Sequence, residues 1–204
     1  MTDIYPDAEP ETRPAPAPTK TRSLVEWIVV VVGAVLVALI IKTFVMQAFF
    51  IPSESMVPTL KINDRVLVNK LSYRLHDVNR GDIIVFERPE GESNDQVKDL
   101  IKRVIALPGE SLVINDNKIY INGQQLAEPY LPAGTINTPG PGGATWTHKC
   151  TTDDPCVVPE GTVWVMGDNR TNSKDSRYIG PIPEDKIVGR AFVTVWPFDR
   201  IGGL

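Results

Sequence analysis

Two serines in the stretch IPSESMVPTL, residues 51–60, could supply a nucleophile. Ser53 and Ser55 lie two residues apart, with a proline on either side of the pair. A serine nucleophile needs a base, and the only histidines of the chain are His76 and His148. Both lie in polar segments typical of loops, which disfavours a histidine triad. Without a base elsewhere, the same pattern would be typical of a surface turn.

A lysine is the other candidate base. It can accept a proton only when burial lowers its pKa from about 10.4 towards neutrality. If residues 99–107, DLIKRVIAL, form a strand, alternation puts Leu100, Lys102, Val104 and Ala106 on one face. Lys102 is the only polar member of that set. The pattern predicts either a buried base or a lysine that protects an edge strand from aggregation.

The stretch GDNRTNSKDSR, residues 167–177, contains no apolar side chain and follows the apolar run TVWVM. It could be a solvated turn. Its arginines and aspartates could also form rigid, fork-shaped pairs that support an active site from below.

The N-terminal part of the chain has two sections. Residues 1–22 are rich in proline, alanine and charge, which predicts a disordered tail. Residues 23–42 contain an uncharged run from Trp27 to Ile41 and predict a transmembrane helix, because about 20 apolar residues cross a bilayer. Lys20 and Arg22 precede the run and favour a cytoplasmic N-terminus, so that residues 43–204 lie outside.

Two alternatives to a membrane span are less consistent with this segment. The run is apolar on all sides, which argues against a buried core helix. A cleaved signal peptide would end in small residues one and three positions before the cut, whereas Met46 precedes Ala48 by two positions.

Residues 43–204 are expected to form an all-β domain with antiparallel sheets. Short runs rich in Val, Ile, Phe and Tyr alternate with Gly, Pro, Asn and Asp. Residues 115–117 and Asn122-Gly123 predict hairpin turns, and a single helical turn is expected near residues 183–186. Residues 130–149, which include TPGPGG, predict a loop insertion. The fold class is therefore mostly β, with one N-terminal transmembrane helix.

The net charge of −4 and a pI near 5.3 argue against a nucleic-acid partner. The chain has two cysteines, Cys150 and Cys156, and this small number disfavours a structural zinc site. The pair is expected to form a disulfide if the domain lies outside the cytoplasm, and to remain as two thiols if it does not.

Four motifs in this order, PSESM, RGDIIVF, IKRVIALPG and GDNRTNSKDSR, follow the apolar run. Together they resemble the bacterial type I signal peptidases, the Ser-Lys leader peptidases, of the single-span Gram-positive and actinobacterial type. The resemblance implies a coiled antiparallel β fold shared with repressor-type peptidases, and no metal or cofactor. It also implies a plasma-membrane endopeptidase, close to the bilayer and the secretion translocon. Such an enzyme removes signal peptides from exported preproteins after a small-x-small motif.

The resemblance also implies roles for individual residues. Ser55 corresponds to the nucleophile and Lys102 to the general base, and the Ser53 hydroxyl joins the Ser55 N–H in the oxyanion hole. Glu54 occupies a position where many relatives have glycine. The remaining implied residues are Ser173, which positions the lysine, the supporting pair Asp175 and Arg177, and Arg103, which follows the base. The residues implied to line shallow apolar substrate pockets are Phe49, Ile51, Met56, Leu60, Leu100 and Ile101.

Two other functions would explain part of these features. A non-catalytic β module anchored in the membrane would account for the apolar run and the strands, but not for a lysine on an apolar face. A self-cleaving repressor-type peptidase would share the Ser-Lys chemistry, but the sequence has a predicted membrane span in place of a DNA-binding domain.

Overall fold

The structure is a computed structural model, and it describes residues 20–89, 98–140 and 146–204. Most of the predicted tail, residues 1–19, lies outside the described residues, and so do residues 141–145 of the predicted insertion. The chain divides into two compact units, with the boundary between Ile40 and Ile41.

The first unit contains one helix, α1, from Lys20 to Ile40. Its apolar side chains are exposed along most of its length, for example Trp27 at 69% and Val29 at 64%. Among the helices of the described residues, none combines the length and the mean hydropathy that a membrane crossing requires. The second unit begins with a π-helical turn over Ile41–Val45.

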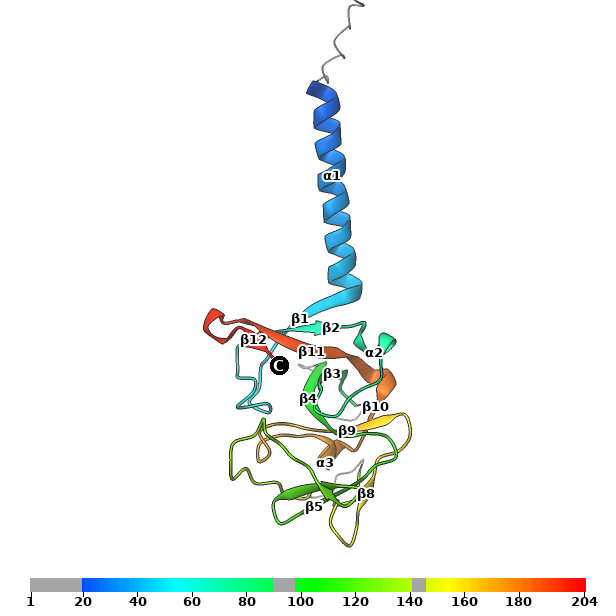
Figure 1. Cartoon of the computed structure of the whole chain (residues 1–204), viewed down its shortest axis with the longest axis vertical. Coiled ribbons are helices and arrows are strands. Elements are labelled where there is room, and N and C mark those ends of the chain that lie inside the picture. The colour runs from blue at the N-terminus through cyan, green and yellow to red at the C-terminus, as the bar shows by residue number, and fades with distance from the viewer. Residues whose placement is uncertain (1–19, 90–97, 141–145) are drawn as a thin grey trace, which may run out of the picture. The chain divides into compact units, whose positions relative to one another are not determined.

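The second unit is mostly β, as predicted, and its largest element is an eight-stranded sheet whose strands pair antiparallel (Figure 1). The strand order is β1-β2-β11-β3-β4-β9-β10, and β12 pairs with β11. The strands are β1 (Met46–Phe50), β2 (Arg65–Asn69), β3 (Ile83–Glu87), β4 (Asp99–Ala106), β9 (Thr162–Met166), β10 (Ile182–Pro183), β11 (Ile187–Trp196) and β12 (Gly202–Gly203).

The strand sequences agree with their positions in this sheet. Central strands are covered on both faces and are expected to be apolar throughout. In β3, four consecutive residues, Ile83 to Phe86, are buried. In β2, nearer the edge, buried and less buried residues alternate. The strand β11 comes late in the chain but lies between β2 and β3, and two irregularities in its register allow it to bend.

A second sheet contains four strands in the order β7-β6-β5-β8, and β5 and β8 lie at the opposite end of this unit from β1 and β2 (Figure 1). Its strands are β5 (Ser111–Asn115), β6 (Lys118–Ile121), β7 (Gln124–Gln125) and β8 (Cys156–Val157). Asp116 and Asn117 join β5 to β6 with φ angles of 47° and 60°, and Asn122 and Gly123 join β6 to β7 with 51° and 79°. Both predicted hairpin turns are confirmed, because two consecutive positive φ angles are the signature of a type I′ turn.

Cys150 and Cys156 form a disulfide beside the smaller sheet, with their Cα atoms 4.7 Å apart. Both are buried in one core cluster with Trp164 and Met166. The Cys150 carbonyl accepts a hydrogen bond from the N–H of Ile114 in β5 at 2.7 Å. The disulfide therefore belongs to the core of the smaller sheet.

The helices of this unit are short: α2 (Ser72–Leu75), α3 (Ser176–Ile179) and two 3-10 turns, Glu184–Lys186 and Phe198–Arg200. The first 3-10 turn confirms the helical turn predicted near residues 183–186. The sequence pattern predicted no strand in residues 46–50, whereas the structure makes Met46–Phe50 strand β1. Its pairing with β2 across five residues explains the difference, because a partner far along the chain leaves no local signal.

Candidate active site

Ser55 and Lys102 come from different parts of the chain and meet in the structure. Ser55 lies in the turns that follow β1, where the N–H of Val57 donates to the Glu54 carbonyl at 3.0 Å. Lys102 lies on β4. Its Nζ donates to Ser55 Oγ at 2.8 Å and to the Ile101 carbonyl at 2.8 Å. A candidate nucleophile and a candidate base are therefore in direct contact.

Lys102 does not lie on an edge strand. The strand β4 lies between β3 and β9, and Lys102 is 3% exposed. Burial lowers the pKa of Lys102 from its usual 10.5 to about 8. The carboxylates of Asp175 and Asp168 oppose this change, and the Arg88 guanidinium adds to it. A neutral amine, which can accept a proton, is thus accessible near physiological pH.

Ser53 lies beside this pair. Its Oγ is 3.4 Å from Ser55 Oγ, and it is exposed whereas Ser55 is only 9% exposed. An open cavity of about 440 Å³ connects this position to solvent. The residues that line the cavity are Ser53, Glu54, Ser55, Ile62, Leu100, Lys102, Asn172 and Lys174. A peptide in this cavity could reach both hydroxyls and the amine.

The polar segment 167–177 supports the backbone of Ser55. The N–H of Asn169 donates to the Ser55 carbonyl at 3.0 Å, and the Asn169 side chain donates to the Glu54 carbonyl at 3.2 Å. Gly167 approaches this backbone closely: a Cβ added to it would lie 2.3 Å from the Ser55 carbonyl oxygen and 2.3 Å from Ser173 Oγ. Glycine is required at position 167 for this contact.

Ser173 is 8% exposed, and it packs beside Gly167. The resemblance implied that its hydroxyl positions the lysine. In the structure, Ser173 Oγ has no hydrogen-bond partner among the described residues. The serine is therefore placed next to the backbone of the nucleophile, without a hydrogen bond to Lys102 Nζ.

Two buried ion pairs lie beneath the site. Arg177 donates from Nε and Nη2 to the two carboxylate oxygens of Asp175, at 2.8 and 2.9 Å. Asp175 also accepts from the Gly167 N–H at 3.0 Å. Arg103 donates to both oxygens of Asp168 at 2.9 and 2.7 Å. One fork lies within segment 167–177 and the other connects it to β4, whereas the second arginine of the segment, Arg170, pairs with Glu128 rather than with an aspartate.

The matched family model is that of signal peptidase, peptidase S26, and it covers residues 24–196. This range includes both members of the Ser55–Lys102 pair and all of segment 167–177. The chain belongs to the signal peptidase family.

Several signal peptidases are similar to this chain over most of its length. Signal peptidase I of Leptolyngbya laminosa is 42% identical, with 96% of this chain and 91% of the relative covered. The probable signal peptidase I-2 of Synechocystis sp. is also 42% identical, covering 84% of this chain and 72% of the relative. Signal peptidase I of Mycobacterium tuberculosis is 35% identical, covering 98% and 84%. The chain is therefore a serine peptidase of the signal peptidase family.

The apolar residues implied to line this signal peptidase's pockets occupy different environments. Ile51, Met56 and Leu60 are buried in one core cluster with Ile101, and Phe49 packs against that cluster. Leu100 is the member of the set that lines the cavity beside Ser55. Ile62, 44% exposed, also lines it, and the sequence did not identify this residue.

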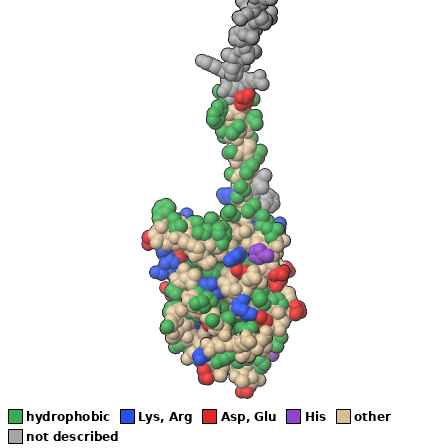
Figure 2. Space-filling model, viewed as in Figure 1, with side chains coloured by type: hydrophobic (Ala, Val, Ile, Leu, Met, Phe, Trp, Pro, Cys, Tyr) green, Lys and Arg blue, Asp and Glu red, His purple; other side chains and the backbone are tan. Residues whose placement is uncertain are grey.

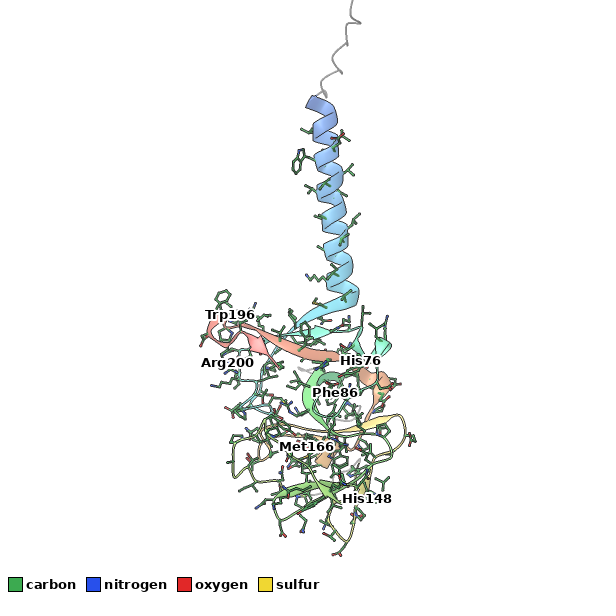
Figure 3. The ribbon with its side chains drawn as sticks, in the orientation of Figure 1. His76, Phe86, His148, Met166, Trp196 and Arg200 are labelled. Carbon is green, nitrogen blue, oxygen red and sulfur yellow. A yellow bond between two sulfur atoms is a disulfide. The ribbon has the colours of Figure 1, made fainter. Side chains whose placement is uncertain are left out.

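The histidines take no part in this site. His76 and His148 lie far apart in the second unit (Figure 3). His148 pairs with Asp154 at 2.8 Å, and His76 Nδ1 contacts the Asp77 carbonyl. Within the described ranges, no group of three His, Cys, Asp or Glu side chains is placed to hold a metal ion.

Sequence reasoning did not identify several residues around the ion pairs. Asp168 accepts a hydrogen bond from the Thr59 hydroxyl at 2.5 Å, and Arg103 lies over the ring of Tyr130 at 4.0 Å. Arg170 pairs with Glu128 at 2.5 Å. The polar composition of segment 167–177 was the only signal for Asp168 and Arg170, and nothing in the sequence indicated Glu128 or Tyr130.

Proposed function

We propose that this signal peptidase removes N-terminal signal peptides from exported preproteins with a catalytic pair formed by Ser55 and Lys102. The observation that carries this proposal is the 2.8 Å contact between Lys102 Nζ and Ser55 Oγ at a buried position on a central strand. The lowered pKa of the lysine supports the same assignment, because a charged ammonium could not act as a base.

The reaction follows from this geometry. Neutral Lys102 accepts the proton of the Ser55 hydroxyl while Oγ attacks the scissile carbonyl carbon. The Ser53 hydroxyl and the Ser55 N–H donate to the oxygen that becomes negative. Lys102 then gives its proton to the departing amine, and an acyl-enzyme remains. Lys102 next accepts a proton from a water molecule, which attacks the acyl carbon. The proton returns to Ser55 Oγ as the bond to the signal peptide breaks.

Segment 167–177 supports the reacting groups without touching the scissile bond. Asn169 fixes the carbonyl of Ser55 and, through its side chain, that of Glu54. The pair Asp175–Arg177 holds the N–H of Gly167, and Arg103 fixes Asp168. Ser173 adds a polar group next to the nucleophile's backbone. Preorganised support of this kind fixes the reacting distance, and a displacement of about 1 Å can reduce a rate about a hundredfold.

The substrate would lie extended in the open cavity beside Ser55. Leu100 and Ile62 supply apolar surface, and Ser53 and Lys102 supply polar groups. A cavity of this kind suits small side chains before the cleaved bond. We expect backbone hydrogen bonds between the extended substrate and the enzyme to supply affinity.

Membrane attachment is part of the same proposal. Residues 1–22 form a cytoplasmic tail, residues 23–42 a single span, and residues 43–204 the catalytic domain outside the cytoplasm, with residues 130–149 as a loop. The uncharged run from Trp27 to Ile41, the preceding cations and the exposed apolar side chains of α1 support this arrangement. It would hold the serine near the bilayer and the secretion translocon, where preproteins emerge. Protease added to intact cells should then digest residues 43–204, whereas full protection of this domain would contradict the orientation.

The direct test uses the purified full-length protein in detergent with a model preprotein that carries an Ala-x-Ala site. We expect cleavage after the second alanine, and no cleavage by Ser55→Ala. An active Ser55→Ala variant would contradict the assignment of the nucleophile. Cleavage of a separate substrate molecule also distinguishes this enzyme from an inert β module and from a peptidase that cuts only itself.

A further inference from the structure

A cluster of polar residues that includes Arg170 of segment 167–177 is built around a single carboxylate, that of Glu128. Its Oε1 pairs with Arg170 Nη2 at 2.5 Å and accepts a hydrogen bond from the Tyr130 hydroxyl at 2.9 Å. Its Oε2 accepts from the Asn137 amide at 3.2 Å. We call Glu128, Tyr130, Asn137 and Arg170 the Glu128 network. Three of its four members come from residues 128–137, in or next to the predicted loop insertion.

The network is shielded from water. The side chain of Arg170 is 0% exposed and that of Glu128 is 10% exposed. Asn137 is 5% exposed, and its carbonyl oxygen accepts from Arg170 Nη1. Burial and the nearby Glu128 carboxylate raise the pKa of Tyr130, so that its hydroxyl remains a donor. A buried charge with this many partners is costly to disturb.

The network reaches the catalytic machinery along two routes. Arg170 donates from Nε to the Gly167 carbonyl at 2.9 Å, and so ties the start of segment 167–177. The ring of Tyr130 lies 4.0 Å from the guanidinium of Arg103, which is the residue after Lys102 on β4. Both sides of the Ser55–Lys102 contact are therefore connected to Glu128.

We propose that three members of the network, Glu128, Tyr130 and Arg170, are positioning residues, and this proposal rests on the proposed function. They hold segment 167–177 against Ser55 and keep water from Lys102. Segment 167–177 supplies Asn169 beneath Ser55, and its residues Asn172 and Lys174 line the cavity that contains Lys102. The charged groups that act on Lys102 are Asp175, Arg88 and Asp168, and two of these three lie in that segment.

Loss of a positioning role would change the pKa of Lys102, whereas loss of a purely structural ion pair would leave that pKa unchanged. When the segment loosens, water reaches Lys102. Because burial is the largest influence on its pKa, the pKa of the amine rises from about 8 towards 10.5, although withdrawal of the Asp175 and Asp168 carboxylates acts in the opposite direction. The rising limb of kcat/KM against pH then moves to higher pH. The value of kcat should fall more than KM rises, because none of the three residues lines the cavity beside Ser55.

The test uses full-length variants Glu128→Gln and Tyr130→Phe, with Glu110→Gln as the control. Glu110 is matched to Glu128, because it pairs with Arg80 at 2.5 Å and accepts from the Leu107 N–H at 2.7 Å, outside the network. Tyr130→Phe removes one hydroxyl and keeps the ring over Arg103, so the change is tested even if Glu128→Gln fails to fold.

We expect Glu128→Gln to lower kcat at pH 7 by about tenfold and to move the limb upward by about half a pH unit or more. Tyr130→Phe should also lower kcat and move the rising limb of kcat/KM to higher pH, but by less. Glu110→Gln should leave the pH of that limb unchanged. Loss of activity without movement of the limb would refute the proposal, as would an equal movement in Glu110→Gln. Failure of the wild-type protein to cleave the preprotein would instead reject the function on which the proposal rests.

Discussion

Substitution of Gly167 by alanine tests the support of the nucleophile by segment 167–177. A Cβ at this position would lie 2.3 Å from the Ser55 carbonyl oxygen, 2.3 Å from Ser173 Oγ and 2.6 Å from Ser173 Cβ. The backbone angle φ of Gly167 is not in the left-handed region. The effect of the substitution is therefore steric.

The magnitude follows from these distances. An ordinary contact of a Cβ is about 3.5–4.0 Å, so the two segments must separate by about 1 Å. The hydrogen bond from the Asn169 N–H to the Ser55 carbonyl, now 3.0 Å, would be stretched by a similar distance. A displacement of this size at a reacting centre can cost about a hundredfold in rate, or about 3 kcal/mol of activation free energy.

The assay is cleavage of the Ala-x-Ala preprotein by folded Gly167→Ala, with the fold checked by circular dichroism. Gly202→Ala is the control, because no atom lies within 4 Å of the Cβ that it would add and its φ is not in the left-handed region. We expect kcat/KM of Gly167→Ala to fall about a hundredfold and that of Gly202→Ala to stay near the wild-type value. A folded Gly167→Ala enzyme with more than about a third of wild-type activity, a loss under 1 kcal/mol, would show that this contact does not set the position of Ser55.

Three further predictions concern the lysine and the disulfide. Lys102→Arg should be folded but inactive in the cleavage assay, because guanidinium stays protonated; more than about a tenth of wild-type activity would reopen the search for the base. Because the pKa of Lys102 is lowered to about 8 in the folded state, the unfolded chain binds more protons between pH 8 and 10.5. This residue should therefore add about 3 kcal/mol to the free energy of unfolding as the pH rises across that window. Urea titrations of the wild type at several pH values should show this rise. The same titrations of Lys102→Met should lack it. Changing Cys150 and Cys156 to serine should lower the free energy of unfolding by about 2 kcal/mol with kcat retained, and a loss of kcat in the folded double variant would contradict a purely structural disulfide.

The sequence predicted a structural feature where the residues that form it lie in one continuous segment. The apolar pattern of residues 99–107 predicted the strand that carries Lys102, and paired Asn, Asp and Gly residues predicted both hairpin turns. The polar segment 167–177 left a solvated turn and a network of Arg–Asp pairs open as alternatives, and the buried pair Asp175–Arg177 agrees with the second.

Long-range partners explain what the sequence did not reveal. Glu128 acts on Arg170, 42 residues away, and Tyr130 acts on Arg103 through a ring contact that no spacing rule describes. The apolar set around Ser55 was implied by the family resemblance, and burial in a shared core decides which of its members line the cavity. The sequence pattern also did not identify a group of exposed apolar residues away from Ser55. These side chains are between 42% and 74% exposed, and they are Phe50, Trp196, Phe198 and Ile201. Hydrophobic side chains gather at that end of the second unit, where Trp196 is labelled (Figure 2, Figure 3).

The position of β11 determines when during synthesis the large sheet can be completed. Residues 187–196 are made late, yet they separate β2, which follows Ser55, from β3, which pairs with the strand of Lys102. Until these residues have left the ribosome, β2 and β3 have no strand between them, and the contacts of segment 167–177 connect Ser55 to the strand of Lys102 without the help of β11. The large sheet can therefore be completed only after residue 196 has been synthesised.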